Sequence, residues 1–309
     1  MKKIYQGFTG LLACFTIAIT TQAQNQAGVD STGLPGDNFS LQGALALFQK
    51  ATSPEDFEKL LNSEDNHVNN LDLNDDGEID YIRVIDNSDK EAHAFALQAV
   101  VSEKESQDIA VIELEKTGDT TAIIQIVGDE DIYGEEIIVE PGEGDEEDDA
   151  AIQYNFNNGI THGPSAAGYY IANPRIVINV WFWPSVRFVY APAYRPWISP
   201  WRWRHYPVWW KPWHPLRWHV WHPFRRPYYH HFAVVRTHRV VRAHAIYRPV
   251  RVTSVTVRTR HAATVNNYRV TRTRTTVTGP RGHKATRTTT TVRGKGGKVK
   301  ARKTTVRRR

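Results

Sequence analysis

Oxygen-bearing side chains recur at alternate positions between residues 72 and 80, in the stretch DLNDDGEID. In a tight loop such side chains converge on one point, and Gly77 permits the sharp turn that convergence needs. Carboxylate, amide and carbonyl oxygens are the ligands that Ca²⁺ prefers, roughly six to eight at a time. The sequence therefore predicts a calcium site. Its predicted ligands are the side chains of Asp72, Asn74, Asp76 and Asp80 and the backbone carbonyl of Glu78.

The first nine positions of this loop resemble the calcium loops of EF-hand and dockerin proteins. Position twelve departs from that pattern, because Arg83 stands where an EF-hand has a bidentate glutamate. The β-prone stretch YIRVID follows, so the loop is more similar to those between strands in FG-GAP repeats. The resemblance implies a structural cation that closes a hairpin, and it covers this one loop only. The alternative is a metal-free turn, since Asn, Asp and Gly are also common turn formers.

The elements that must position this loop are predicted from hydrophobic periodicity. Leu41, Leu45 and Phe48 repeat at helical spacing, and Ser53-Pro54 is a typical start for a second helix over about 54–62. From Ile79 to Val139 several β-branched runs are separated by short polar links, which favours antiparallel neighbours. We therefore predict an α+β fold for residues 39–141, with two helices and about five mainly antiparallel strands. We expect this acidic domain to fold alone.

The charges divide the chain into two unlike halves. All 33 Asp and Glu lie between Asp30 and Asp149, whereas 31 of the 39 Lys and Arg lie in residues 150–309. Residues 24–149 thus carry −27 and residues 150–309 carry +31, and all ten Trp lie between Trp181 and Trp221. This asymmetry argues against one uniform globular enzyme. It predicts a basic tail that binds anionic partners by electrostatic attraction.

Composition divides the chain beyond residue 141 into three segments. Residues 142–190 are an acidic linker with possible extra strands, residues 191–232 are rich in Trp, Pro, His and Arg, and residues 233–309 are rich in Arg, Thr and Val. We expect this low-complexity cationic region to be largely irregular or weakly β, because nine prolines fall within 184–227 and the Thr/Val repeats that follow favour at most a marginal hairpin.

Two interpretations of the Trp-rich segment remain open. Its composition resembles that of antimicrobial peptides such as indolicidin, which implies a surface for anionic lipid or glycan. Alternatively, its side chains cap the core of the preceding domain. Several imidazoles in or near this segment are also candidate ligands for Zn²⁺, Cu²⁺ or Ni²⁺, although no helix or cysteine orders them. These are His214, His219, His222, His230 and His231.

The amino terminus predicts export. Lys2-Lys3, the apolar run from Leu11 to Ile19 and the small residue Ala23 follow the order of a secretory signal peptide, residues 1–23, and 24–38 then form a flexible spacer. Cys14 is the sole cysteine, so the mature chain would contain no disulfide. A lipoprotein anchor at Cys14 is not favoured, because much of the apolar run follows it. We expect the protein in the periplasm, at the cell surface or secreted.

The sequence contains none of the motifs G-x-S-x-G, H-E-x-x-H and G-x-x-x-x-G-K-[ST]. The chain resembles a secreted bacterial protein, and we predict a non-enzymatic envelope protein. In this interpretation a calcium-stabilised acidic domain carries a basic tail that binds anionic polymers, lipids or extracellular DNA. One alternative is a structural or self-assembling protein whose acidic and basic halves neutralise each other. A third is an envelope hydrolase that uses a pair of Asp residues.

Overall fold

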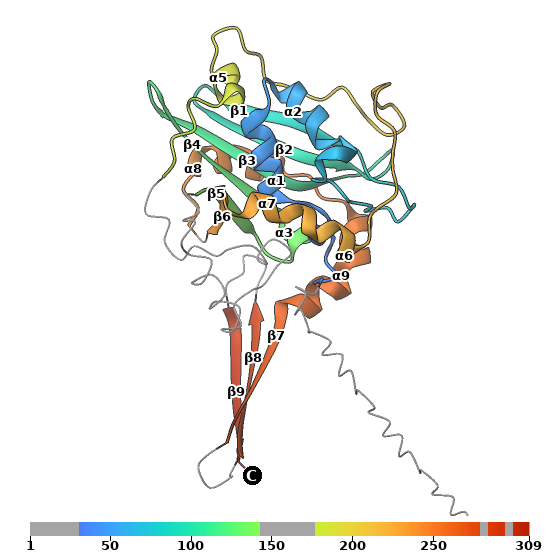
Figure 1. Cartoon of the computed structure of the whole chain (residues 1–309), viewed down its shortest axis with the longest axis vertical. Helices are drawn as coiled ribbons and strands as arrows, with labels where there is room; N and C mark the ends of the chain where they lie inside the picture. The colour runs from blue at the N-terminus through green and yellow to red at the C-terminus, as the bar shows by residue number, and fades with distance from the viewer. Residues whose placement is uncertain (1–30, 143–176, 236, 279–283, 294–298, 309) are drawn as a thin grey trace, which may run out of the picture. The chain divides into compact units, whose positions relative to one another are not determined.

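Six antiparallel strands form the main sheet, in the order β1-β2-β3-β4-β5-β6 (Figure 1). The computed structural model describes residues 31–142, 177–235, 237–278, 284–293 and 299–308. The predicted signal peptide, residues 1–23, and most of the predicted linker lie outside these residues. The strands are β1 (Ile82–Asp89), β2 (Ala92–Val100), β3 (Ser106–Gly118), β4 (Thr121–Gly128), β5 (Ile137–Pro141) and β6 (Phe232–Val235).

Two helices precede the sheet, as the sequence predicts. They are α1 (Leu41–Lys50) and α2 (Pro54–Leu61). The Ser53 hydroxyl caps α2 by accepting a hydrogen bond from the Asp56 amide at 3.1 Å, and Pro54 occupies the first helical position. Figure 1 shows both helices lying across one face of the sheet. The α+β fold class predicted from the sequence is therefore confirmed.

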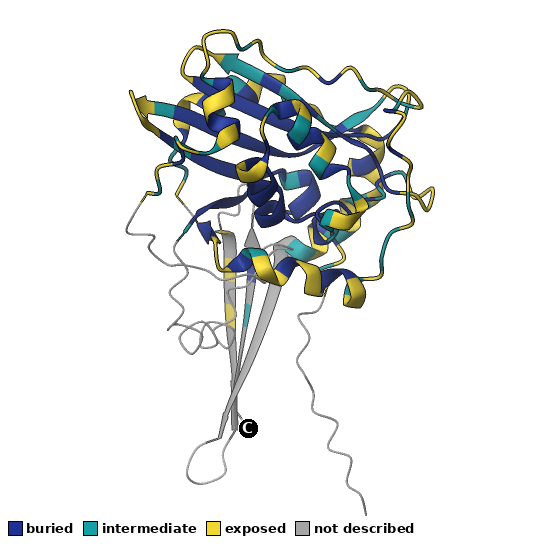
Figure 2. Cartoon of the chain, turned by 45° about the horizontal axis from the view of Figure 1, so that its top comes forward, coloured by how far each residue is buried: buried dark blue, intermediate teal, exposed yellow. Residues whose placement is uncertain are grey.

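The two faces of the sheet bury different side chains. Phe95, Leu97 and Ile112 point toward α1 and α2 and are fully buried in the larger core. The opposite face is lined by smaller residues, including Ala94 and Ala96, and it packs on the helix α8 (Val241–Tyr247). Figure 2 shows that the strands are buried along most of their length. Both faces are therefore covered, and α8 comes from the cationic part of the chain.

The cationic region contributes more structure than the sequence indicates. Strand β6 pairs with β5 from Ile138↔Val235 to Pro141↔Phe232, so strand pairing crosses the boundary predicted at residue 141. The described residues belong to one compact unit. The region also contains helices, most of them short. They are α5 (Pro184–Val189), α6 (Trp218–Trp221), α7 (Arg226–Tyr229), α8 and α9 (Val255–Arg269). Another short α-helix of the described chain, α3 (Glu130–Tyr133), lies between β4 and β5.

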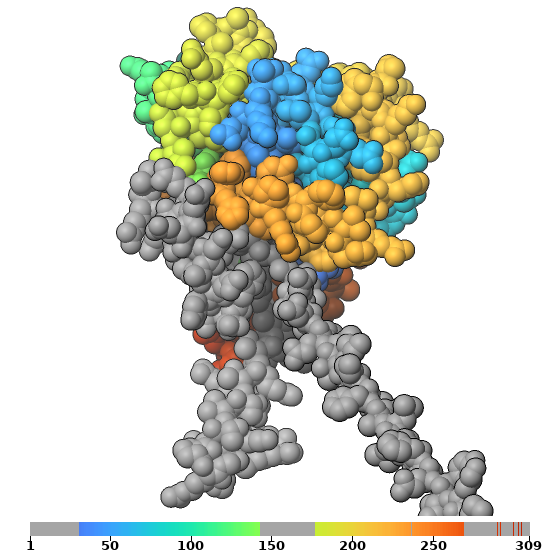
Figure 3. All heavy atoms as spheres, in the orientation of Figure 1, coloured from blue at the N-terminus to red at the C-terminus, as the bar shows by residue number. Residues whose placement is uncertain are grey.

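The Trp-rich segment caps the core rather than standing apart from it. Trp221 is 1% exposed, and its indole N–H donates to the Asp37 carbonyl at 2.9 Å. Ser199 N donates to the Val84 carbonyl on the edge strand β1 at 3.1 Å. In Figure 3 the surface of this face is formed jointly by the N-terminal helices and by yellow and orange residues of 177–235. Proline spacing correctly limits the helices here, but it does not prevent packing.

The segment predicted as a flexible spacer is also partly ordered. Residues 35–38 form a short 3₁₀ helix, and Asp37 within it is 2% exposed. The Asp37 carboxylate accepts hydrogen bonds from Thr32 Oγ1 at 3.0 Å and from the Gly33 amide at 2.9 Å. The described part of the spacer, 31–38, is therefore held by local hydrogen bonds and by Trp221.

A second sheet has three antiparallel strands near the C-terminus. These are β7 (Val270–Thr278), β8 (Lys284–Arg293) and β9 (Val299–Arg308), in the order β7-β8-β9. The Thr/Val repeats of the sequence favour at most a marginal hairpin, so this sheet is more regular than the sequence indicates. No helix in the described part of the chain has both the length and the hydropathy that a membrane span requires.

Candidate cation loop, basic strap and cationic sheet

The loop predicted to bind calcium is closed by hydrogen bonds to its own carboxylates. Asp72 Oδ2 accepts from the Gly77 amide at 2.9 Å, and Asp76 Oδ1 accepts from the Glu78 amide at 2.9 Å. Asp75 and Gly77 have left-handed backbones, with φ of 55° and 82°, a conformation that Gly and Asp adopt most readily. The sequence therefore forms the tight turn that a calcium loop needs.

Asp80 is the buried member of this loop. Asp80 is 5% exposed, and its Oδ2 accepts a hydrogen bond from the Leu73 amide at 2.6 Å. Burial raises the pKa of Asp80 to about 8, and the charges of Asp72 and Asp76 add to the effect. A buried carboxylate beside two others is costly to ionise, and a bound cation would offset that cost.

The predicted ligands share the loop without forming a complete cage. Their carboxylate and amide oxygens are hard donors, which fit Ca²⁺. However, the carboxylates of Asp72, Asp76 and Asp80 are not among the described groups of three ligand residues whose donor atoms all lie within 4.8 Å of one another. The predicted carbonyl donor, Glu78, is exposed. The structure thus shows the turn, and the carboxylates would have to rotate inward around an ion.

Two segments of the cationic region contact this loop, one around residue 213 and the other at Arg260. Arg260 donates to the Leu73 carbonyl at 2.6 Å and pairs with Asp75 at 2.9 Å. His214, a predicted metal ligand, instead places Nδ1 2.7 Å from the Gly77 carbonyl oxygen. The Trp213 carbonyl accepts from the Ile79 amide at 2.9 Å. The loop therefore joins the acidic and cationic parts of the chain.

Residues 237–260, here called the basic strap, cover the face of the sheet opposite α1 and α2. That face carries a row of buried polar side chains, which are Asp108, Glu113, Glu115, Gln125 and Glu140. Arg239 pairs with Glu140 at 3.2 Å, and Arg242 pairs with Glu115 at 3.3 Å. Buried carboxylates need such partners, because an isolated buried charge is strongly unfavourable. The buried carboxylates of the strands thus form ion pairs with arginines of the basic strap.

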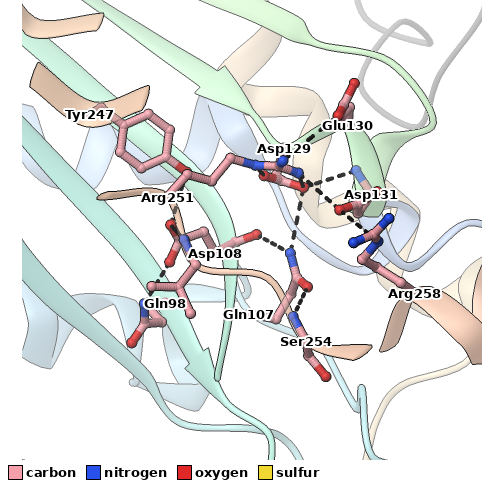
Figure 4. A network of polar contacts seen from close by, with 11 residues as sticks. Gln98, Gln107, Asp108, Asp129, Glu130, Asp131, Tyr247, Arg251, Ser254 and Arg258 are labelled. Carbon is pink, nitrogen blue, oxygen red and sulfur yellow. Dashed lines mark hydrogen bonds and ion pairs between the residues drawn. The ribbon is translucent and has the colours of Figure 1, made fainter. Parts of the chain in front are cut away.

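Arg251 is the centre of the densest part of this contact (Figure 4). Its guanidinium donates to Asp129 at 2.5 and 2.8 Å and to Asp131 at 2.9 Å. The hydrogen bonds with Asp129 and the two negative charges raise the pKa of Arg251, so it stays protonated. The next residue, Val252, donates its amide to Asp108 at 2.8 Å, and Asp108 also accepts from the Tyr247 hydroxyl at 3.0 Å. The strap is therefore fixed by both side chains and backbone.

Replacing Arg251 by Met should destabilise the protein by about 3 kcal/mol, because the substitution leaves Asp129 buried without its cation. This is the low end for a broken buried pair, since the Arg251 side chain is 27% exposed. The matched control is Arg248→Met, an exposed arginine of the same strap, which should change stability by less than about 0.5 kcal/mol. Chemical denaturation of both variants gives the comparison. Equal losses would show that Arg251 has no special structural role.

Two histidines of the strap converge on one carboxylate of the sheet. His244 Nδ1 lies 2.7 Å from Glu113 Oε1, and His238 Nε2 contacts Glu113 Oε2. The Glu113 side chain is fully buried, and the two imidazole side chains are 22–23% exposed. Among the described residues, these three form a group of potential metal ligands, because their donor atoms all lie within 4.8 Å of one another.

The histidines named from the sequence do not form such a group in the described structure. They are His214, His219, His222, His230 and His231. Burial, reinforced by the charges of Arg225 and Arg226, lowers the pKa of His222 to about 4. This low pKa keeps His222 neutral near pH 7.

Sequence reasoning missed Glu113 and the strap. A signal was present, since Glu113 and Glu115 alternate with Ile112 and Leu114 along one strand. Such alternation indicates one polar face, usually a solvated one. Here that face is buried, and the basic strap replaces the solvent.

The Trp-rich segment makes a similar contact on the other face. Glu58 of α2 is 2% exposed and accepts four hydrogen bonds, from the Tyr81 hydroxyl, the Val84 amide, Trp197 Nε1 and the Ser199 hydroxyl, at 2.8–3.1 Å. Two of these donors come from the Trp-rich segment. For Trp197 and Trp221, capping of the core is the interpretation that the structure supports.

The charges that remain are concentrated near the C-terminus. Residues 31–141 contain 26 Asp or Glu and 6 Lys or Arg, and residues 177–269 add 16 Lys or Arg, so these two segments together carry −4. Residues 270–309 contain 14 Lys or Arg and no acid. The two segments 31–141 and 177–269 are therefore nearly neutral together. Residues 270–309, which include β7, β8 and β9, here called the cationic sheet, are strongly positive.

The register of β7, β8 and β9 keeps its cations apart. Arg272 lies opposite Thr290, Arg287 lies opposite Thr275 and Val306, and Arg302 lies opposite Thr291. Among the paired positions, no Lys or Arg faces another Lys or Arg directly. Directly opposed like charges destabilise a sheet, so this register allows a strongly cationic sheet to form.

No protein-family model, curated protein or solved structure matches the chain.

Proposed function

We propose that this chain is an exported, non-catalytic envelope protein in which residues 270–309 bind polyanions or anionic membrane surfaces. The supporting observation is the distribution of charge. The basic strap is paired with the acidic sheet, whereas 14 Lys or Arg of residues 270–309 have no acidic residue near them in sequence. A segment of this kind attracts anions of many shapes with little sequence preference.

The chemistry of the partner follows from export and from the residues. The amino terminus predicts that the protein leaves the cytoplasm, which leaves lipid phosphates, acidic glycans and extracellular DNA as targets. Arg supplies paired N–H donors that match a phosphate, and Lys supplies a point charge. The test compares binding of the full chain, and of a chain that ends at residue 269, to phosphatidylglycerol vesicles. The shorter chain should not bind.

Calcium has a structural role in this proposal. Asp72, Asn74, Asp76 and Asp80 and the Glu78 carbonyl would hold the ion. Its positive charge would offset the cost of ionising Asp80, whose pKa is raised mainly by burial and further by the charges of Asp72 and Asp76. Because Arg260 and Trp213 contact the same loop, an ordered loop would also secure the strap and the Trp-rich segment.

Millimolar Ca²⁺ should raise the melting temperature of the protein. At 100 times the dissociation constant the added stability is about 2.7 kcal/mol, because only the folded loop binds the ion. Asp76→Asn should remove most of this gain. Asp75→Asn, which removes the same charge from the same loop at a position outside the ligand pattern, should retain it. Melting curves in Ca²⁺ and in chelator give the comparison, and an unchanged wild-type curve would contradict the metal site.

A second candidate is a structural protein whose halves neutralise each other. The ion pairs of Arg239, Arg242 and Arg251 support it, and they form within one chain. They account for the strap but not for residues 270–309. Oligomers of the full chain that dissolve in salt would favour this candidate over polyanion binding.

A further inference from the structure

The cluster of Glu113, His238 and His244 combines elements that are far apart in sequence. Glu113 comes from the central strand β3, His238 precedes α8, and His244 lies within α8. Both imidazoles reach the same carboxylate, one at each oxygen, and their ring centroids are 4.1 Å apart. The fold itself therefore brings three ligand-type side chains together between the strap and the sheet.

The three donors match one class of metal ion. Two imidazole nitrogens and one carboxylate oxygen are a frequent ligand set for Zn²⁺, which takes a water as its fourth ligand. In a tetrahedral site with metal–ligand distances of about 2.0–2.1 Å, neighbouring donor atoms lie about 3.3 Å apart. The donor atoms here all lie within 4.8 Å of one another. Side-chain rotation would close the remaining gap without movement of the strands.

The strand neighbours of Glu113 do not compete with an ion for its carboxylate. Ala94 lies opposite Glu113 on β2, so a small side chain borders the carboxylate on that side. Gln125 lies opposite Glu113 on β4, and its amide is already engaged with the Arg239 amide at 2.7 Å and the Thr237 carbonyl at 2.9 Å. The partly exposed imidazoles connect the cluster to solvent, which supplies both the ion and its water ligand.

We infer that Glu113, His238 and His244 form a Zn²⁺ site that fastens the basic strap to the central strand of the sheet. This site is separate from the calcium loop in its residues and in its ligand chemistry. It also involves none of residues 270–309, so it does not depend on the proposed function. Because the ligands come together only in the folded chain, the ion should stabilise the fold.

The experiment measures Zn²⁺ binding to the full chain by competition with a chromophoric chelator, in the presence of millimolar Ca²⁺ to occupy the acidic loop. The variants are His238→Gln, His244→Gln and Glu113→Gln. The matched control is His219→Gln, which removes an exposed imidazole outside the cluster. Co²⁺ is used as a second probe, because its visible bands report nitrogen ligation and coordination number in the wild-type chain without any substitution.

We expect one tight Zn²⁺ equivalent in the wild type and in His219→Gln. Each cluster variant should bind that equivalent at least ~10-fold more weakly, and the wild-type Co²⁺ complex should show the intense bands of a four-coordinate site. Two results would overturn the inference. One is the lack of a saturable equivalent and of such Co²⁺ bands in the wild type. The other is an affinity that His238→Gln and His244→Gln leave equal to that of the control. The wild-type measurements decide the matter even where a variant fails to fold.

Discussion

A chain that ends at residue 141 should fail to fold, whereas a chain that ends at residue 269 should fold with nearly the melting temperature of the full chain. The shorter chain lacks several fully or largely buried side chains of the main core, which are Val180, Val186, Val189, Phe232, Val234 and Val257. Each such side chain contributes roughly 1.5–3 kcal/mol by burial. Together they match the whole stability of a typical domain, about 5–15 kcal/mol.

Truncation at residue 141 also removes the partners of the buried carboxylates. Glu113, Glu115 and Glu140 would face solvent as a row of like charges on one sheet face. Circular dichroism and thermal melting of the two truncated chains give the comparison. This expectation replaces the one from sequence, in which residues 39–141 fold alone. Cooperative unfolding of the chain that ends at residue 141 would restore the earlier interpretation and make the strap dispensable.

The sequence predicts the N-terminal part of the fold well, because local signals and tertiary packing agree there. Ser53 caps the helix that starts at the next residue, and Leu41, Leu45 and Phe48 are all buried on one side of α1. The strands from β1 to β5 likewise have high β propensity and short links. The order of the antiparallel strands follows directly from those links.

The cationic region is poorly predicted for a physical reason. Its stability comes from contacts that span more than 100 positions, such as Arg251 with Asp129 and Trp197 with Glu58. Hydrophobic periodicity does not report contacts of this kind. The strap packs through Val240, Tyr247 and Val257 and through its arginines and histidines, which meet carboxylates that another part of the chain has buried. Composition alone therefore suggests an irregular tail.

The candidate sites show the same division. The calcium loop lies within nine residues, so its ligands can be named from sequence. No local sequence pattern connects Glu113 with His238 and His244, which are more than 100 positions away. The sequence directs attention to the more conspicuous histidines of the Trp-rich segment. Of these, His214 contacts the Gly77 carbonyl and His222 is buried.

Binding of the full chain to anionic vesicles should fall steeply with salt. A bound polyanion releases condensed counterions, so affinity decreases by about 0.7–0.9 log units per log unit of salt for each contacted phosphate. If about six of the 14 cations of residues 270–309 make contact, affinity should fall about 10³-fold between 50 and 200 mM salt. Replacing Arg302, Lys303, Arg307 and Arg308 by Gln should reduce the slope by about 3 if all four contact phosphate.

The most direct test of the account is therefore the affinity of the full chain and of the chain that ends at residue 269 for phosphatidylglycerol vesicles, measured from about 50 to 500 mM salt. Phosphatidylcholine vesicles and duplex DNA serve as the neutral and the non-lipid comparison. The account predicts salt-sensitive binding of the full chain to both anionic partners, weak binding to phosphatidylcholine, and no comparable binding of the shorter chain. Equal affinity of the two chains, or binding of the full chain that salt does not weaken, would contradict the claim that residues 270–309 carry the function.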